Sequence, residues 1–560
     1  MHVLEVSTPA SLGRVPQMLS PRIELADVIS RTDALSPGEM SNVDAIVIGA
    51  GAAGSTAADE LCLRGLKVLV LDAGWQRSFC EQPAHALFSS LLNIDERTIE
   101  SKTLRLRILW KLEQYFRFLD ARRQPVQSSN YAWPTAPDKF VDDLSFPYEN
   151  GAESDFHWIR CHGPGGRMSV PLHGRQYYRF GPEHFSRSDL SNGDWPIGYA
   201  DLEPWYEHIE KRLELRGMED HSQWIPDSCI SKKLILSATE TEIIENIKTR
   251  YRNAEPIMGR FAPPIAPFAV ASKQGDFLFR RGAVVSHIKP GNGGRRHSVL
   301  FYDRITKSHQ VVSAPIVFCC ASSLESTRIL LQTFETADIK RPHEGGDPLG
   351  GNLMDHVSYT LKGWGGPIER HENSSDKGRC IYLPRFDARN EKQVCQDSVQ
   401  NRFGVRLLRY PSRLGRQSFV ATMEGEMLPN LQSRVRLSGR RNAFGIPLLN
   451  IDFRYGESEN GFLKDFLTAS EELVDLFGIS VPRGLQDCLN PPGSYIHEMG
   501  TARMGSSPSS SVLTEKNELW DFPGIFVTDG SCFVTQGTQH PTLTIMALTA
   551  RACEFAAASV

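Results

Sequence analysis

A glycine-rich turn near residue 50 constrains the fold of this 560-residue chain more than any other feature of its sequence. The apolar run Val43–Ile48 leads into Gly49, Gly51 and Gly54, and a stretch with helical spacing follows. In this pattern the first glycine permits a tight turn out of a strand, the second lets backbone N–H groups approach a pyrophosphate, and the third lets the helix pack closely on the strand. Because the N-terminus of a helix carries partial positive charge, we predict that a dinucleotide binds at this turn.

An acidic residue follows at the end of a second apolar run, Lys67–Leu71. The order of strand, tight turn, helix and strand is one βαβ unit. Asp72 lies about 20 residues beyond the glycines, where an acid accepts hydrogen bonds from a ribose diol. A carboxylate there would repel a 2′-phosphate, which disfavours NADP. The motif alone leaves both NAD and FAD open.

Further periodicity predicts an α/β fold that contains a separate antiparallel sheet. We expect a strand at Val311–Cys320. Segments with helical spacing are Arg105–Phe118, Asp201–Arg216 and Ser323–Gln332. Short alternating runs, which favour antiparallel strands, recur between about Val357 and Ile479 at Arg402–Leu408, Ser418–Met423 and Arg434–Leu437. The last part of the chain returns to α/β character, so the nucleotide-binding part draws on both ends of the sequence.

Composition and charge argue against several classes of function. The formal net charge is −4, so no overall positive field would recruit nucleic acid. No apolar run reaches the roughly 18 residues that a membrane helix needs. The N-terminal residues lack the basic start and apolar core of a secretory signal, so we expect a cytoplasmic protein. The 11 cysteines include no CxxC pair, which predicts neither a disulfide framework nor a metal site.

The C-terminal region carries the motifs that most narrow the function. Between His497 and Arg551 the chain reads HEMGTARMG, then DGSCFVTQ, then HPTLTIMAL. These motifs resemble the signature end of the GMC (glucose–methanol–choline) oxidoreductase family. Segments similar to other motifs of that family are CASSLESTRIL at 320–330, GNLMDH at 351–356, GEMLPN at 425–430 and FGIP at 444–447. The resemblance extends from Val43 to about Ala556.

The resemblance implies a Rossmann-like FAD-binding domain that is interleaved with a substrate domain built on an antiparallel β-sheet. We place an arm at 1–42, the FAD-binding domain at 43–356 and 491–560, and the substrate-binding domain at 357–490. Residues that the resemblance assigns to the cofactor are Gly49, Gly51, Ala52, Ala53, Gly54, Asp72, Val285, Asp529, Gly530, Pro541 and Thr542. Some relatives attach the flavin to a histidine a few residues after a double glycine. Val170 stands in that register here, so we expect non-covalent FAD.

The same resemblance places two histidines, His497 and His540, at the reacting hydroxyl. Alcohol oxidation removes a proton from oxygen and a hydride from carbon, and in this family flavin N5 accepts the hydride. Imidazole titrates near neutral pH, which suits His497 to the role of base, while His540 would hold the forming alkoxide. Pro541 favours the first turn of a helix over Thr542–Arg551, whose N-terminus would stabilise negative charge on reduced flavin.

The substrate is indicated only by a branch-level resemblance. Phe156–Arg160, Gly165–Arg167 and Gly174–Gln176 are similar to a bacterial branch that includes sugar and glycoside dehydrogenases, which implies a polyhydroxy alcohol. The electron acceptor stays open among oxygen, a quinone and a protein carrier. Two other functions also stay open, a flavin-containing lyase and a non-catalytic binding protein of the same fold. The histidines that we interpret as structural are His157, His162, His173 and His356.

Overall fold

The computed structural model describes residues 35, 37–75, 121–170, 176–186, 194–263, 267–273, 276–291, 296–339, 348–365, 379–390, 402–411, 417–481 and 488–559. The predicted helix Arg105–Phe118, His173 and most of the arm at 1–42 lie outside the described residues. Within the arm, α2 (Pro37–Ser41) is a short helix. None of the described helices is long and apolar enough to cross a membrane.

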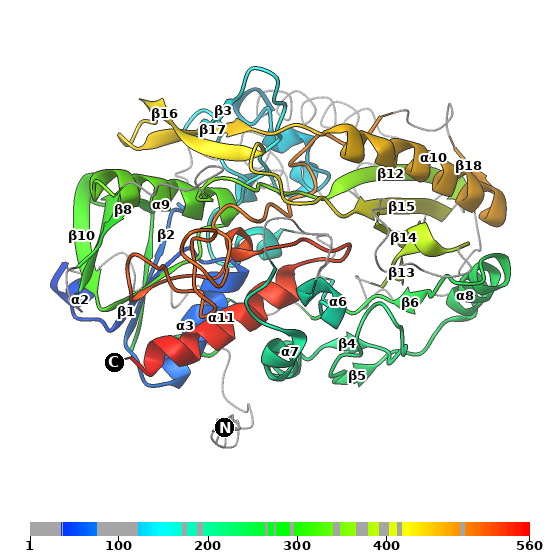
Figure 1. Ribbon diagram of the computed structural model, residues 1–560, viewed down its shortest axis with the longest axis horizontal. Helices are drawn as coiled ribbons and strands as arrows, with labels where there is room; N and C mark the ends of the chain where they lie inside the picture. The colour runs from blue at the N-terminus through cyan, green and yellow to red at the C-terminus, as the bar shows by residue number, and fades with distance from the viewer. Residues whose placement is uncertain are drawn as a thin grey trace, which may run out of the picture.

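A parallel five-stranded sheet forms the centre of the nucleotide-binding part (Figure 1). Its strands, in spatial order, are β19 (Ile525–Val527), β11 (Ile316–Cys319), β1 (Ala45–Ile48), β2 (Val68–Asp72) and β7 (Phe277–Arg281). Most of them are continuous buried apolar runs, as expected for parallel strands that are covered on both faces. Strands from both ends of the chain therefore meet in one sheet, and the predicted interleaved α/β fold is confirmed.

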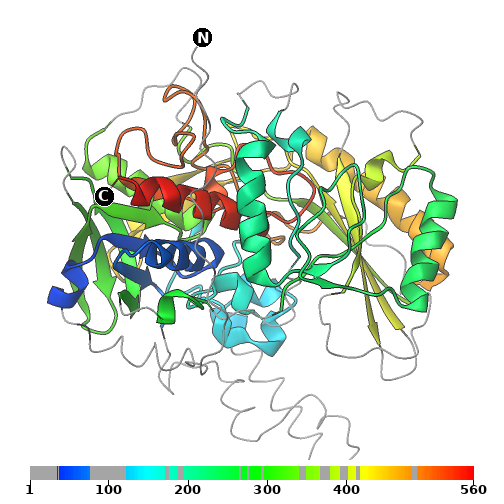
Figure 2. The same ribbon diagram turned by 90° about the horizontal axis from the view of Figure 1, so that it is seen from below.

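Helices from distant parts of the sequence pack together beside this sheet (Figure 2). α3 (Ala52–Leu63) contacts α11 (Thr542–Ala557), which also contacts α7 (Tyr199–Leu213). α9 (Ser323–Thr336) follows β11 directly. The helices predicted at Asp201–Arg216, Ser323–Gln332 and Thr542–Arg551 are confirmed, with ends displaced by up to six residues.

The strand predicted at Val311–Cys320 is in fact two strands in two different sheets. β10 (Ser308–Ala314) pairs with β9 (His297–Asp303) and through it with β8 (Ala283–Lys289), whereas β11 belongs to the parallel sheet. Pro315 separates them. Proline lacks an N–H for the ladder and has a fixed φ, so the chain changes sheets at this residue.

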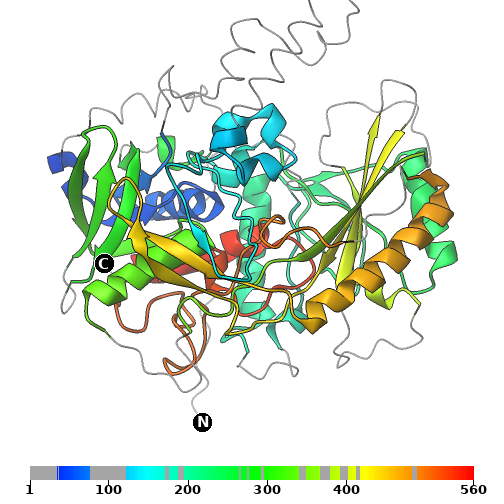
Figure 3. The same cartoon turned by 90° about the horizontal axis from the view of Figure 1, so that it is seen from above.

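An antiparallel six-stranded sheet forms the substrate-side part. Its strands, in spatial order, are β18 (Ile479–Ser480), β12 (Val357–Gly365), β15 (Gln417–Gly425), β14 (Phe403–Pro411), β13 (Ile381–Leu383) and β6 (Ile257–Met258). One face is apolar: Tyr359 and Phe403 pack on Phe466 of α10 (Glu457–Phe477), which lies along the sheet (Figure 3). The predicted strands at Arg402–Leu408 and Ser418–Met423 are confirmed in this sheet.

The third predicted strand, Arg434–Leu437, lies elsewhere. It is part of β16 (Arg434–Arg441), which pairs with β17 (Pro447–Asp452), and β17 pairs in turn with β3 (Glu149–Asn150). The non-alternating segment 426–432, which contains Pro429, leads the chain out of the larger sheet. Val435 N–H then donates to the Gly350 carbonyl, so β16 starts against a different partner.

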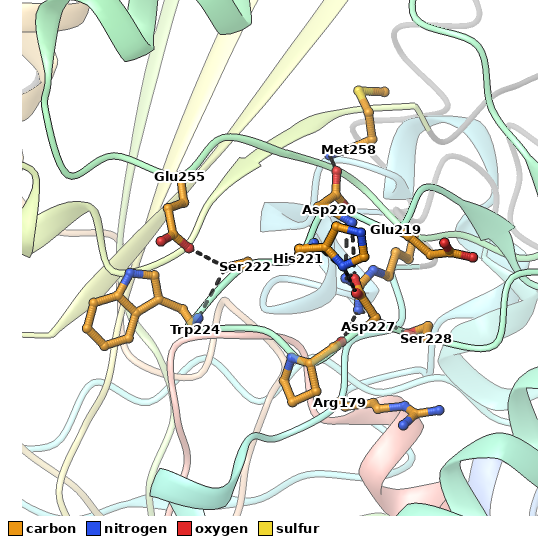
Figure 4. Close-up of polar contacts among 12 residues, drawn as sticks. Arg179, Glu219, Asp220, His221, Ser222, Trp224, Asp227, Ser228, Glu255 and Met258 are labelled. Carbon is orange, nitrogen blue, oxygen red and sulfur yellow. Dashed lines mark hydrogen bonds and ion pairs between the residues drawn. The ribbon is translucent and has the colours of Figure 1, made fainter.

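The buried side chain of Arg260 fixes the connection between β4 (Arg216–Gly217) and β5 (Lys232–Lys233), whose residues Asp220, Asp227 and Ser228 are labelled in Figure 4. The Arg260 guanidinium is fully buried and donates to the Pro226 carbonyl and, over 3.0 Å, to Ser228 Oγ. Carboxylates of Asp227 and Asp220 lie 3.5 and 3.8 Å from its Nη2. The Arg260 carbonyl in turn accepts the N–H of Tyr177, which lines the cavity beside the glycine turn. The helix that follows β5, α8 (Ala238–Arg250), begins with a capping box of Ser237 and Glu240.

Arg260→Met should lower the free energy of unfolding by about 3–5 kcal/mol, because it leaves buried acceptors and carboxylates without their cation. The matched control is Lys233→Met, since Lys233 forms an exposed ion pair with Glu219 and should change stability by less than about 1 kcal/mol. Urea unfolding of the two variants measures this difference. Equal midpoints would show that Arg260 does not hold this loop.

Candidate active site

The three glycines of the turn have three different environments. Gly49 has φ +100°, and a Cβ there would lie 2.4 Å from the Cys320 carbonyl oxygen. A Cβ on Gly54 would lie 1.9 Å from the Gly49 carbonyl oxygen. Beside Gly51, by contrast, a Cβ would meet no atom within 4 Å. Gly49 and Gly54 are thus required by backbone packing, whereas Gly51 borders the open space in which we predict that the pyrophosphate binds.

A long cavity runs from this turn to the two predicted catalytic histidines. All but one of the predicted cofactor residues line it: Gly49, Gly51, Ala52, Ala53, Asp72, Val285, Asp529, Gly530, Pro541 and Thr542. Gly54 does not, because it is packed beneath the turn. His497 and His540 line the same cavity. Among the described residues, no group of three or more His, Cys, Asp and Glu side chains is placed to hold a metal ion.

Asp72 joins three backbone segments at one end of the cavity. Its Oδ1 accepts the N–H groups of Gly74 (2.7 Å) and Gly163 (2.9 Å), and its Oδ2 accepts that of Ala50 (2.9 Å). Burial raises the pKa of this carboxyl. Two carboxylate oxygens offer about four lone-pair sites, so one is left for the predicted ribose contact. Asp72 therefore also has a structural role that its position in the sequence does not reveal.

The C-terminal segment reaches the cavity through another close backbone contact. A Cβ on Gly530 would lie 2.6 Å from both the Glu498 carbonyl oxygen and Ser323 Oγ. The neighbouring Asp529 accepts hydrogen bonds from Ser326 Oγ (2.5 Å) and Ser531 Oγ (2.6 Å). These contacts fix the segments around 323, 498 and 530 relative to one another.

The N-terminus of α11 opens into the cavity, since Pro541, Thr542 and Ile545 all line it. No side chain caps this end of the helix. The helix begins at Thr542, as expected. Pro541 precedes it at the N-cap position, whereas we predicted that this proline would be the first helical residue. The partial positive charge of the helix end is therefore available to a negatively charged group in the cavity.

The two predicted catalytic imidazoles contact each other edge to face. The ring centroids of His497 and His540 are 4.7 Å apart, at an interplanar angle of 67°. His497 is half-buried, whereas His540 is buried. Burial lowers the pKa of His540, so this ring is neutral near pH 7. One hydroxyl group could contact both imidazoles.

A buried ion pair on the substrate-side sheet supports His540. Glu424 Oε1 lies 3.5 Å from His540 Nε2, lies 3.2 Å from Arg406 Nε and accepts a hydrogen bond from the Tyr495 hydroxyl. Burial works to raise the pKa of Glu424, but Arg406 and His540 outweigh it and hold that pKa at about 2. Sequence reasoning did not identify Glu424, Arg406 or Tyr495. Alternation of polar and apolar residues along β14 and β15 indicates which side chains of one strand share a face. It does not indicate which residue of the other strand lies opposite each of them.

A third histidine belongs to the site although we interpreted it as structural. His356 Nδ1 lies 3.0 Å from His497 Nδ1. Its neighbour Asp355 accepts the backbone N–H of His497 (3.0 Å) and lies fully buried, with no hydrogen-bond partner for Oδ2 in the described structure. Burial, followed by the charge of Glu498, raises the pKa of Asp355 to about 7. The GNLMDH motif was the signal for both residues, but it did not show that they contact His497.

Arg167 holds the segment just before His497. Its guanidinium donates to both oxygens of Glu498 (2.6 and 2.8 Å), to Ser322 Oγ (3.2 Å) and to the Ile496 carbonyl. Ile496 has φ +67°, a left-handed conformation that is costly for a β-branched residue. The fork of Arg167 therefore stabilises a strained backbone beside His497, the predicted base.

Val170, which occupies the register of covalent flavin attachment, and two nearby histidines lie at different places relative to the cavity. The Val170 side chain is buried in a cluster with Trp133, Phe140 and Ile159 and does not line the cavity. His162 lines the cavity and contacts Phe146 edge-on, with centroids 4.8 Å apart. His157 lies outside the cavity lining, beside Asp155 at 3.3 Å.

Substitution of the turn glycines should separate cofactor binding from folding. Gly51→Val should keep the fold and lose FAD, because its side chain would extend into the open space. Gly54→Ala should destabilise the fold itself, because its Cβ would collide with the Gly49 carbonyl. Circular dichroism and the ratio of flavin to protein absorbance measure the two effects. Full FAD content in folded Gly51→Val would mean that the phosphates bind elsewhere.

Asp355→Asn should change how stability depends on pH. The pKa of the native carboxyl is about 7 against a reference value of 3.8, so the folded state binds more protons, and stability is lost as pH rises through this window. The amide oxygen can still accept the backbone N–H groups. The stability gained by the variant should therefore grow by about 2–3 kcal/mol between pH 5 and pH 8. Parallel pH profiles of unfolding for both proteins would contradict this account.

Comparisons with known proteins agree with this arrangement. A family model described as GMC oxidoreductase matches residues 429–549, and one described as NAD(P)-binding Rossmann-like domain matches residues 47–80. The fructose dehydrogenase large subunit of Gluconobacter japonicus is 24% identical, over 92% of this chain and 98% of that protein. The 2-methyl-1,2-propanediol dehydrogenase of Mycolicibacterium austroafricanum is 23% identical, over 70% of this chain and 80% of that protein.

Two further comparisons span most of the chain. Paromamine 6'-oxidase of Streptomyces fradiae is 23% identical, over 90% of this chain and 89% of that protein. The crystal structure of pyridoxine 4-oxidase from Mesorbium loti shares the fold, with a TM-score of 0.59 and 15% identity over 92% of this chain and 99% of that one. Residues 429–549 therefore form a GMC oxidoreductase C-terminal domain, and the near full-length relatives and the shared fold agree with the resemblance of the whole chain to the GMC oxidoreductase family.

Proposed function

We propose that this chain oxidises an alcohol group of a polyhydroxy substrate, with His497 as the base and non-covalent FAD as the redox cofactor. The observation that carries the proposal is the pair of imidazoles, 4.7 Å apart, in a cavity that also contains the glycine turn and the N-terminus of α11. FAD, when bound, supplies the acceptor for the hydride.

The side chains divide the remaining chemistry between them. His497 takes the hydroxyl proton, and His540 donates a hydrogen bond to the oxygen as its negative charge develops. Glu424 lies 3.5 Å from His540 Nε2, and its carboxylate, ionised beside Arg406, favours the single proton of the neutral ring on that nitrogen, so Nε2–H is the donor available to the substrate oxygen. The uncapped N-terminus of α11 stabilises negative charge at its end of the cavity.

A polar sheet face supports a polyhydroxy substrate. Cross-strand pairing places Ser358 opposite Glu424, and Thr422 opposite both Thr360 and Arg406, so these side chains share one face. The same face turns toward the His540 segment, since Tyr382, opposite Arg406, donates to the Thr538 carbonyl (2.9 Å). Ser358 and Thr360 accept hydrogen bonds from Asn490, and Glu424 is paired with Arg406, so the surroundings of His540 on this side are polar, which suits a polyhydroxy substrate better than a long-chain alcohol. Relatives named as sugar and diol dehydrogenases agree with this choice.

Non-covalent binding is supported by the position of Val170. No nucleophilic side chain stands there, and the valine is buried away from the cavity. Acid denaturation should therefore release the yellow flavin into the supernatant. Colour that stays with the precipitated protein would contradict this part of the proposal and direct attention to His162.

The test of the reaction is anaerobic mixing of the holoenzyme with polyols, glycosides and fatty alcohols. Bleaching of the oxidised flavin by polyols or glycosides is the expected result. Conversion of substrate without bleaching would favour the lyase alternative, and an absence of any conversion would favour a binding protein. Bleaching by fatty alcohols alone would contradict the substrate class.

His497→Ala should slow flavin reduction by about 10²- to 10⁴-fold with little change in FAD content, the range for a positioned acid–base group. Single-turnover absorbance at saturating substrate measures this rate. A decrease of less than about fivefold would count against His497 as the base.

His540→Asn should retain much more activity than His540→Ala. An amide can donate to the developing alkoxide as imidazole does, whereas a methyl group leaves the oxygen partly unpaired at about 1–3 kcal/mol, or about 10- to 100-fold in rate. The two reduction rates are compared above saturation. Equal rates would remove His540 from the catalytic pair.

A further inference from the structure

We propose that His356 is a positioning residue that fixes the tautomer of His497, so that the catalytic ring presents a bare Nε2 as the base. This inference rests on the proposed function for its catalytic consequence, but its structural part stands on the contacts of His356 alone. The two rings meet through their Nδ1 atoms, 3.0 Å apart, so one of these nitrogens must donate and the other must accept.

The opposite edge of His356 determines which nitrogen accepts. His356 Nε2 lies 3.1 Å from the Gly537 carbonyl oxygen. A carbonyl oxygen only accepts hydrogen bonds, so Nε2 of His356 carries a proton. In a neutral ring the Nδ1 of His356 is then bare.

A second contact leads to the same assignment independently. Gln536 Nε2 lies 3.2 Å from His356 Nδ1, and Gln536 Oε1 accepts the backbone N–H of Met427 (3.1 Å). The Met427 contact fixes the orientation of the amide, so the Gln536 NH₂ group donates toward His356. A proton on His356 Nδ1 would face this donor directly.

His356 is also placed to stay neutral. It is buried, and this burial lowers its pKa to about 4. The charged and titratable groups around the two rings are Glu424, Glu426, Arg406, His540, Tyr495 and Asp355. The carboxylates Glu424 and Glu426 raise that pKa, and His540 lowers it, without bringing it back to its ordinary value.

The consequence for His497 follows from its single proton in the neutral state. His497 Nδ1 donates to His356, so the lone pair lies on His497 Nε2. When Nε2 takes the proton of the substrate hydroxyl, the charge on the ring strengthens the hydrogen bond to His356. His356 cannot pass this proton on, because its own Nε2–H faces a backbone carbonyl. The proton must therefore leave His497 through Nε2.

Two variants of similar shape separate this role from a structural one. His356→Asn places an amide oxygen near the former Nδ1 and keeps an acceptor, whereas His356→Leu removes it, and both lose the imidazole Nε2–H. FAD content and substrate KM should be similar in the two holoenzymes. The rate of flavin reduction should fall by about 10-fold or more in the leucine variant and by less than about threefold in the asparagine variant.

The pH profile and the tautomer itself give the decisive readouts. Loss of the acceptor destabilises imidazolium at His497, so the kinetic pKa of the base should fall in His356→Leu and not in His356→Asn. ¹⁵N spectra of histidine-labelled resting holoenzyme, assigned with His497→Gln, should show His497 protonated at Nδ1. Equal rates and profiles in the two variants, or wild-type His497 protonated at Nε2, would overturn the proposal. The spectra are recorded without substrate and therefore test the tautomer alone. A failure of the proposed function would appear separately, because no alcohol would bleach the flavin.

Discussion

Close backbone packing at the carboxyl end of the parallel sheet joins the glycine turn to the segments that carry His497 and Asp529. Gly54 lies against the Gly49 carbonyl, and Gly49 lies against the Cys320 carbonyl. From Cys320 the chain enters α9 through Ser323, which together with Glu498 leaves no room for a side chain at Gly530. These contacts join segments that are far apart in the sequence without a flexible side chain between them. The glycine turn and the segment that carries His497, the predicted base, are therefore fixed in one rigid frame.

Fixed charges surround this frame, while the imidazoles inside it are held neutral. Arg167 pairs with Glu498 beside the cavity, and Arg406 pairs with Glu424 behind His540. Burial lowers the pKa values of His540 and His356, so neither competes with His497 for a proton near pH 7. One basic group among neutral donors is the arrangement that removal of a hydroxyl proton requires. The cost of burying these charges is partly offset by two hydrogen bonds from Arg167 to Glu498, and by the ion pair with Arg406 and the hydrogen bond from Tyr495 at Glu424.

The sequence predicted those features whose physics is local. The spacing of Gly49, Gly51 and Gly54 predicts a turn, a phosphate cradle and a packing contact; the turn and the packing contact are found where expected, and the space beside Gly51 is open. The helix after Pro541 could also be predicted, because its start and its periodicity lie within a few residues. Pairing between strands that are far apart in the sequence could not be predicted. Cross-strand partners depend on register, which one sequence does not reveal, so Glu424 and Arg406 were missed and Arg434–Leu437 was assigned to the wrong sheet.

His356 illustrates the same limit within a recognised motif. Its resemblance to the family was visible, but its contact with His497 spans 141 residues, and only the fold brings the two rings together. A lone histidine in an apolar segment is usually a satisfied core residue, and His356 does satisfy both of its nitrogens. Its role arises because one of its partners is the predicted base.

The most direct measurement of the central claim uses a polyol or glycoside that bleaches the flavin, prepared with deuterium at the carbon that bears the oxidised hydroxyl. The holoenzyme is mixed with labelled and unlabelled substrate without oxygen, and flavin absorbance is followed through a single turnover. The account predicts that the labelled substrate reduces the flavin more slowly, because the C–H bond breaks as hydride leaves for the cofactor. Conversion of substrate with the flavin still oxidised would contradict it.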